Sequence, residues 1–262
     1  MGTCTTMIDA ANAAAETQPR LAPPPSQLKR PALFLDLDGV LAPLAPTPDA
    51  VGPEPRRTRV LKALAARLDG RVAIVSGRTL SEIDRIAEAS VDSASGVHGL
   101  ERRDALGVIT TAQADPGVRR AVEAFREFAR TRPGILVEDK TVSAGLHYRA
   151  APEEGEAALA LADRLAGQTG LTIQPGILVV ELKTPGATKG TAVSAFMGEA
   201  PFRGATPVML GDDLTDEYGF EAARAMGGFG VLVGPERETA ATYRLPDVDA
   251  VLAWLEHVEE AE

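Results

Sequence analysis

The chain has 262 residues, of which 45% are hydrophobic, 24% are charged and 4% are aromatic. This composition predicts a packed globular protein with an aliphatic core. The formal net charge is −10 and no run of lysine and arginine exceeds a pair, so a nucleic-acid partner is not expected. A single cysteine, Cys4, excludes a disulfide within the chain. Since no apolar run suits a membrane span or a secretory signal either, we expect a cytoplasmic protein.

Residues 1–30 are rich in Ala, Thr and Pro and show no sustained period, which predicts a disordered tail. From Ala32 onward, short apolar runs that end in Gly, Ser or Asp alternate with helical patterns. The apolar runs are ALFLD, RVAIVSG, SASGVHG, PVMLGDD and FGVLVG. This alternation is typical of βαβ units around a parallel sheet that is covered on both faces, so the expected fold class is α/β.

The middle of the chain follows a different pattern of helix, hairpin, helix and hairpin. The string ILVEDKTVSAGLHYR predicts a hairpin that turns near residues 143–145, and LTIQPGILVVELK predicts a second one that turns at 175–176. An antiparallel α+β pattern inside a parallel one indicates an inserted domain. We place this domain at residues 107–186, which divides the parallel core into residues 31–106 and 187–262.

Carboxylates follow two of the predicted core strands. Asp36 and Asp38 are two residues apart and would project from the same side of the first strand. Asp212 and Asp213 follow a later strand. Ligands of open α/β sheets bind at the carboxyl ends of strands, so these groups would form an oxygen-rich site for a divalent cation, with Mg²⁺ as the natural candidate. The alternatives are an acidic loop at the first strand and helix capping by Asp213 at the second.

Two further segments suit a phosphate group. Ser76 stands at another strand end, and the backbone N–H groups after Gly77 could face an anion. Lys189 stands at the start of a predicted helix, where its charge opposes the helix dipole, so a compensating anion is expected nearby. Taken singly, Ser76 is as well explained by a helix cap and Lys189 by a solvated surface position. The succession of such features at strand ends favours a phosphate site.

Polar and apolar side chains alternate on the two predicted hairpins. The polar pairs that share a face are Glu138 with Lys140, His147 with Arg149, and Glu181 with Lys183. A solvent-facing antiparallel sheet would show the same alternation. The mixture of acids, cations and imidazole favours instead a surface that binds a ligand with many hydroxyl groups.

In this order, the core motifs resemble those of the haloacid dehalogenase-like (HAD) phosphatases, which are marked by Asp-x-Asp, Ser or Thr, Lys and a late acidic pair. The matching residues are Asp36, Asp38, Ser76, Lys189, Asp212 and Asp213. The resemblance implies a Rossmann-like, parallel-sheet HAD core with an inserted α+β cap domain. It also implies Mg²⁺ as cofactor and an aspartyl-phosphate intermediate.

The resemblance also implies roles for individual residues. Asp36 would attack phosphorus, and Asp38 would donate a proton to the leaving oxygen and then accept one from water. Lys189 and Ser76 would hold phosphate oxygens. The residues that would bind the metal ion or support its ligands are Asp36, Asp38 through its backbone carbonyl, Asp212, and, in support, Asp213 and Asp216.

Four strings resemble a narrower family, the trehalose-6-phosphate phosphatases: GVHGLE, VEDK with HYR, VVELK and GDDLTDE. This resemblance implies a cap that closes over trehalose 6-phosphate, and a functional link to a trehalose-6-phosphate synthase. The residues that would contact the substrate are Gly77, Arg78, His98, Glu138, Lys140, His147, Arg149 and Glu181. Among these, the two histidines could instead serve only to position a loop or a hairpin.

Other functions stay open at this point. The same chemistry could act on another sugar phosphate, such as a sucrose- or mannosylglycerate-type phosphate, and a phosphomutase would use the same aspartyl group. A non-catalytic sugar-phosphate sensor could also keep this scaffold. Such sensors commonly lose the nucleophile or a metal ligand, whereas Asp36, Lys189 and Asp212 are all present here.

Overall fold

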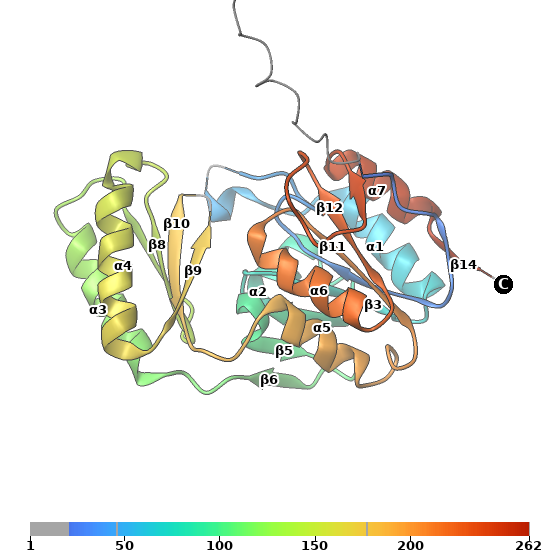
Figure 1. The fold of residues 1–262 in the computed structure, drawn as a ribbon, viewed down its shortest axis with the longest axis horizontal. Coiled ribbons are helices and arrows are strands. Elements are labelled where there is room, and N and C mark those ends of the chain that lie inside the picture. The colour runs from blue at the N-terminus through green and yellow to red at the C-terminus, as the bar shows by residue number, and fades with distance from the viewer. Residues whose placement is uncertain (1–20, 46, 177, 262) are drawn as a thin grey trace, which may run out of the picture.

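The computed structural model describes residues 21–45, 47–176 and 178–261, which form two units side by side (Figure 1). The large unit is built on an eight-stranded sheet in the order β13-β12-β11-β2-β3-β4-β5-β6. The small unit is built on a four-stranded sheet in the order β7-β8-β10-β9. Cys4 and the first twenty residues of the predicted tail lie outside the described residues.

The parallel part of the large sheet confirms the predicted α/β fold class, because every neighbouring pair from β13 to β4 is parallel. The strands are β2 (Pro31–Leu35), β3 (Val72–Val75), β4 (Ser93–Gly96), β5 (Glu101–Arg103), β6 (Ile109–Thr111), β11 (Thr206–Gly211), β12 (Phe229–Val233) and β13 (Tyr243–Leu245). The helices are α1 (Pro55–Arg67), α2 (Leu80–Ala87), α5 (Lys189–Met197), α6 (Glu217–Ala225) and α7 (Val248–His257). Among the helices of the described ranges, none is both long and apolar enough to cross a membrane.

Helices cover both faces of the large sheet, as the continuous apolar strands predict. In β2, Leu33 and Leu35 face one side and pack with α1, α2 and α7, whereas Phe34 faces the other side and packs with α5 and α6. Leu33, Phe34 and Leu35 have no exposed surface, so β2 lies at the centre of the unit. The carboxyl ends of β2, β3 and β11 are thereby fixed at one edge of the sheet.

The small unit is an antiparallel sheet with two helices on one face. Its elements are α3 (Pro116–Ala129), β7 (Leu136–Asp139), β8 (Ser143–His147), α4 (Gly155–Thr169), β9 (Thr172–Gly176) and β10 (Val179–Lys183). Apolar side chains of α3 and α4 pack against Leu146, Val180 and Leu182. Figure 1 shows the helices on the outer side, so the opposite face of the sheet is turned toward the large unit.

The transition between the units differs from the predicted boundary after residue 106. Strand β6 pairs with β5, and β5 pairs antiparallel with β4, so the large sheet continues as far as Thr111. The small unit therefore starts at α3. The strand was missed because Ile109–Thr111 is short and exposed, without the apolar run that marks the buried core strands.

Both hairpin turns also lie elsewhere than predicted. The first hairpin turns at residues 140–142, between β7 and β8, and Gly145 lies inside β8 opposite both Glu138 and Glu181. The second turns after Gly176, and Pro175 lies in the edge strand β9. Glycine and proline were taken as turn residues, but here the glycine lies inside a central strand and the proline occupies a sheet edge, where a missing N–H is tolerated.

Residues 21–30 are ordered, which corrects the prediction of a disordered tail for this part of it. Strand β1 (Gln27–Leu28) pairs in parallel with β14 (Glu259–Glu260), and Leu28 is buried. The indole Nε1–H of Trp254 donates to the carbonyl of Pro25 at 3.1 Å. Proline-rich sequence lacks a helical or strand period, yet its carbonyl groups still accept hydrogen bonds from a neighbouring element.

Three phenylalanines pack together where β2 meets α5: Phe34 of β2, Phe196 of α5 and Phe202 of the following turn. The ring centroids of Phe34 and Phe202 are 5.4 Å apart, and those of Phe196 and Phe202 are 5.3 Å apart. We expect Phe202→Ala to lower the free energy of unfolding by about 3–5 kcal/mol, because it empties a fully buried site. Urea denaturation measures this loss. Leu106→Ala, at a side chain that is 89% exposed, is the control and should change the value by no more than about 0.5 kcal/mol.

Candidate active site

A pocket of about 650 Å³ lies where the small unit faces the carboxyl ends of β2, β3 and β11. From the large unit it is lined by Asp36, Asp38, Ser76, Gly77, Arg78, His98, Lys189, Asp212 and Asp213. From the small unit it is lined by Glu138, Lys140, His147, Arg149 and Glu181. Two residues that the sequence predicts for the site, Asp216 and Lys183, do not line the pocket, because both side chains are buried beside it.

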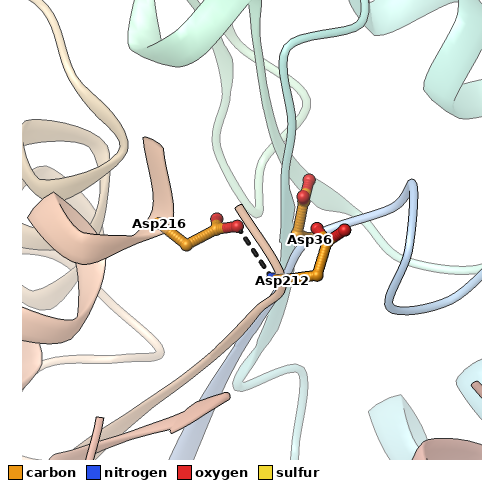
Figure 2. A group of neighbouring side chains, drawn as sticks. All are labelled: Asp36, Asp212 and Asp216. Carbon is orange, nitrogen blue, oxygen red and sulfur yellow. Dashed lines mark hydrogen bonds between the residues drawn. The ribbon is translucent and has the colours of Figure 1, made fainter. Parts of the chain in front are cut away.

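Three carboxylates converge at the floor of the pocket. Asp36, Asp212 and Asp216 each place one oxygen within 4.8 Å of the others (Figure 2). Gly39 makes this convergence possible, since a Cβ at its position would lie 2.0 Å from Oδ2 of Asp212, and its φ of +75° is a conformation that other residues rarely adopt. Burial raises the pKa of Asp36 well above its ordinary value, although Lys189 opposes this shift. Burial and the neighbouring carboxylate of Asp216 raise the pKa of Asp212 to about 7.

Asp216 organises this floor from behind. Its Oδ2 accepts hydrogen bonds from the backbone N–H groups of Asp212 and Asp213, both at 3.0 Å. Its Oδ1 accepts a hydrogen bond from Nζ of Lys189 at 2.7 Å. Because both oxygens are engaged by the protein, Asp216 fixes the acidic loop and the lysine, while Asp36 and Asp212 present oxygens to the pocket.

Lys189 is the cation of this cluster and not a surface residue. It is 3% exposed, and its Nζ lies 2.9 Å from Oδ2 of Asp36. Burial alone would lower the pKa of Lys189, but the carboxylates of Asp216 and Asp36 raise it above its ordinary value. One ammonium thus faces three carboxylates, which leaves an excess of negative charge. A divalent cation suits this donor set in charge and in ligand type.

The carboxylate of Asp38 points away from the other three and pairs with Arg78. Nε and Nη2 of Arg78 donate to its two oxygens at 2.7 and 2.8 Å, a bidentate arrangement. Nη1 of Arg78 also donates to Glu82 at 3.2 Å. The sequence analysis missed Glu82, although its position four residues after Arg78 in a helical pattern is a signal for such a pair.

Ser76 and Asp213 differ in whether they act as helix caps. Ser76 does not cap α2, because Thr79 is the N-cap and forms a reciprocal capping box with Glu82. The Ser76 side chain is buried at the carboxyl end of β3, and its Oγ accepts the N–H of Arg78 at 3.2 Å. Asp213 does act as a cap, since its carboxylate accepts the N–H of Leu214 at 2.6 Å.

The small unit contributes a polar cluster to the opposite wall. Nζ of Lys140 lies 3.0 Å from Oε2 of Glu181 and 3.4 Å from Oε2 of Glu138, and it donates to the carbonyl of Gly77 in the large unit at 3.0 Å. Nε2 of His147 lies 2.9 Å from Oε2 of Glu138. Burial alone would raise the pKa of Glu181, but Lys140 lowers it to about 2. Arg149 donates to the carbonyl of Ala45, which is a second contact between the units.

His98 lies between the two walls. It belongs to a short 3₁₀ turn, η2 (Val97–Gly99), and its Nε2 is 3.9 Å from Oε2 of Glu181. Its imidazole packs so closely on Gly77 that a Cβ there would lie 2.7 Å from the ring. Burial lowers the pKa of His98 to about 3, so the ring is neutral at physiological pH. It therefore contributes hydrogen-bonding capacity and packing to the pocket, not charge.

Comparison with known proteins adds independent information. A protein-family model described as "Trehalose-phosphatase" matches residues 34–249. The chain is 40% identical over 232 residues to a trehalose-6-phosphate phosphatase of Escherichia coli (strain K12), and the match covers 88% of this chain and 87% of that protein. A crystal structure titled as a trehalose-6-phosphate phosphatase related protein matches with a TM-score of 0.72 at 26% identity, covering 86% of this chain and 95% of that one. The fold also matches a phosphatase of the haloalkanoate (HAD) enzyme superfamily from Bacteroides thetaiotaomicron, with a TM-score of 0.62 at 20% identity over 90% of this chain and 97% of that one.

The neutral His98 makes a testable contribution to the pH dependence of stability. Its pKa is about 3 in the folded chain and about 6.5 when unfolded, so unfolding is favoured as the pH falls below 6.5. We expect the free energy of unfolding to fall between pH 7.5 and pH 5 by about 2 kcal/mol more in the wild type than in His98→Gln. Urea denaturation at both pH values measures the difference. His257→Gln, at an exposed position, is the control, and an equal fall in all three proteins would contradict the assignment.

Proposed function

The chain belongs to the trehalose-phosphatase family, and we propose that it hydrolyses trehalose 6-phosphate to trehalose and phosphate. The observation that carries this proposal is that one pocket combines two different surfaces. Its floor holds carboxylates and a lysine suited to phosphoryl transfer, and its opposite wall holds acids, an amine and an imidazole suited to a polyhydroxylated ligand. These two surfaces together support a sugar-phosphate phosphatase. Membership of the family favours trehalose 6-phosphate as the substrate.

The nucleophile in this proposal is Asp36. Its Oδ2 is held by Lys189, which leaves Oδ1 to attack phosphorus. The attack forms an aspartyl phosphate and releases the sugar oxygen, and water then attacks phosphorus and restores the carboxylate. Lys189 and Ser76 lie beside Asp36 in the pocket and would hold phosphate oxygens as negative charge develops on them.

Asp38 is proposed as the acid–base residue. It would give a proton to the leaving sugar oxygen and later take one from the attacking water. In the structure its carboxylate is held by Arg78, so it has to exchange this partner for the substrate. Nε and Nη2 of Arg78, which bond Asp38 in the structure, would then donate to two phosphate oxygens, a bidentate geometry that suits arginine.

The donor set of the floor fits a divalent cation, and we propose Mg²⁺. Asp36, Asp212 and the backbone carbonyl of Asp38 would hold it, with Asp213 and Asp216 supporting the loop that carries Asp212. Such an ion supplies positive charge, so that a carboxylate can approach a phosphate dianion. Asp216, already bound to Lys189 and two N–H groups, fixes the position of this loop.

The small unit is proposed to act as a cap that recognises the sugar. Glu138, Lys140, Arg149 and Glu181 would contact sugar hydroxyl groups, with His98 and His147 holding the contacting side chains in place. Gly77 and Arg78 would contact the phosphate end of the ligand. Closing a polar wall over the substrate excludes bulk water and leaves buried polar groups unpaired when a hydroxyl is missing, which selects the sugar.

The proposal also covers the source of the substrate and the location of the enzyme in the cell. Trehalose 6-phosphate is itself the product of a synthase, so a functional link to a trehalose-6-phosphate synthase is part of it. A cytoplasmic location is proposed on the single cysteine alone. The nearest alternative is a phosphatase for another sugar phosphate, which the substrate comparison below separates.

A substrate panel tests the function. With Mg²⁺ present, we expect phosphate release from trehalose 6-phosphate to exceed release from glucose 6-phosphate and sucrose 6-phosphate by about 100-fold in kcat/KM, because several buried polar contacts are lost with the smaller or altered sugar. Asp36→Asn is the control for contaminating activity and should release no phosphate. Equal rates on all three esters would contradict the substrate assignment, and full turnover by Asp36→Asn would contradict the nucleophile.

The metal site is tested without reference to turnover. We expect millimolar Mg²⁺ to raise the melting temperature by about 2–4 °C, because a bound cation relieves the repulsion among Asp36, Asp212 and Asp216. Asp212→Asn should melt at or above the wild-type temperature without the ion and show no shift with it. Asp163→Asn, at an exposed position of α4, is the control and should keep the shift. A shift that survives in Asp212→Asn would place the ion elsewhere.

A further inference from the structure

Lys183, the last residue of β10, is a buried lysine that the proposed chemistry leaves unused. Its exposed fraction is 2%, and its Nζ donates to the backbone carbonyl of Ala187 at 2.7 Å. It does not line the pocket. A buried ammonium held by a neutral carbonyl is unfavourable, and burial lowers the pKa of Lys183. A methionine would fill the same space without this penalty, so packing alone does not explain the residue.

The acceptor of this hydrogen bond lies just before a residue of the active site. Ala187 belongs to the linker of residues 184–188 that joins β10 to α5 (Figure 1). Thr188 follows and caps α5, since its Oγ1 accepts the N–H of Thr191 at 3.1 Å. Lys189 is the first residue of α5. The Lys183 contact therefore fixes the backbone two residues before the lysine that meets the nucleophile.

The large unit holds the same segment from the other side. A Cβ on Gly99 would lie 2.7 Å from the carbonyl oxygen of Thr188, and a Cβ on Gly190 would lie 2.3 Å from that of Tyr218. The backbones approach so closely at these two points that the start of α5 cannot shift toward η2 or α6. Lys183 restrains it from the side of the small unit.

Lys183 also continues the strand that carries the proposed sugar contact. Glu181 lies two residues earlier on the same face of β10, lines the pocket and pairs with Lys140. Strand β10 is hydrogen-bonded on both sides, to β8 and to β9, so Glu181 and Lys183 move as one body. Strand β10 and the linker after it thus connect the pocket wall that holds Glu181 to the first turn of α5.

From these contacts we propose that Lys183 is a positioning residue, whose hydrogen bond to the Ala187 carbonyl aligns Lys189 with the substrate phosphate when β10 engages the sugar. The proposal rests on the function proposed above. It assigns to Lys183 an effect on turnover and not on substrate affinity, because Lys183 touches the linker and not the pocket.

The test compares Lys183→Met, which keeps the length of the side chain without its donors, with Lys183→Arg, which keeps a donor. On the best wild-type substrate, with Mg²⁺ present, we expect Lys183→Met to lower kcat about 10- to 100-fold with KM changed less than about threefold, since a small displacement of a phosphate-binding group has effects of this size. Lys183→Arg should restore most of the lost kcat. Lys62→Met, at an exposed lysine of α1, is the matched control and should match the wild type.

A second variant keeps the test informative if Lys183→Met does not fold. Gly186 has a φ of +98°, and a Cβ there would meet no atom within 4 Å, so Gly186→Ala disturbs the linker backbone without touching a neighbour. We expect the same signature, a lower kcat with an unchanged KM. Unchanged kcat in folded Lys183→Met would overturn the proposal, as would unchanged kcat in Gly186→Ala where Lys183→Met does not fold. A loss that falls wholly in KM, or one that Lys183→Arg does not reduce, would overturn it as well.

The outcome is separable from that of the proposed function. If the wild type prefers a phosphate ester other than trehalose 6-phosphate, the substrate assignment fails, but the comparison of Lys183 variants is still made on that ester. If the wild type hydrolyses trehalose 6-phosphate and Lys183→Met turns it over at the same rate, the positioning role alone fails.

Discussion

The arrangement of this molecule depends on placing one ammonium among three carboxylates at the edge of a parallel sheet. Lys189 bonds Asp36 on one side and Asp216 on the other, and the charges still do not balance. Such a cluster is unfavourable in an interior of low dielectric unless neighbouring groups fix it and a further cation completes it. The buried strands supply the first of these conditions, together with the close approach of Gly39 to the Asp212 side chain and of Gly190 to the Tyr218 backbone.

The floor and the opposite wall of the pocket use similar side chains in different electrostatic arrangements. On the floor, carboxylates are crowded together, so burial and mutual repulsion raise the pKa of Asp36 and Asp212. On the opposite wall, acids and cations are paired, and Lys140 lowers the pKa of Glu181. The first arrangement suits the cation and the phosphate of the proposed reaction, whereas the second is a surface of paired donors and acceptors that suits hydroxyl groups.

Sequence reasoning predicted the parallel core and the grouping of site residues because both follow from periodicity and from the rule that strand ends converge. It could not predict which side chains pair once they converge. Asp38 pairs with Arg78 and not with a metal-facing neighbour, and this choice depends on rotamers and on the cap of α2. It also misplaced the turn near Gly145, since the sequence alone does not distinguish a glycine inside a strand from a glycine that turns the chain.

The pairing of β1 with β14 has a topological consequence. Residues 27–28 run beside residues 259–260, so the first and last strands of the described chain pair with each other, away from the pocket. A unit whose first and last strands pair can be inserted into a longer polypeptide, or circularly permuted, with little change to its interior. This folding pattern is therefore well suited to serve as a self-contained module in chains of different design.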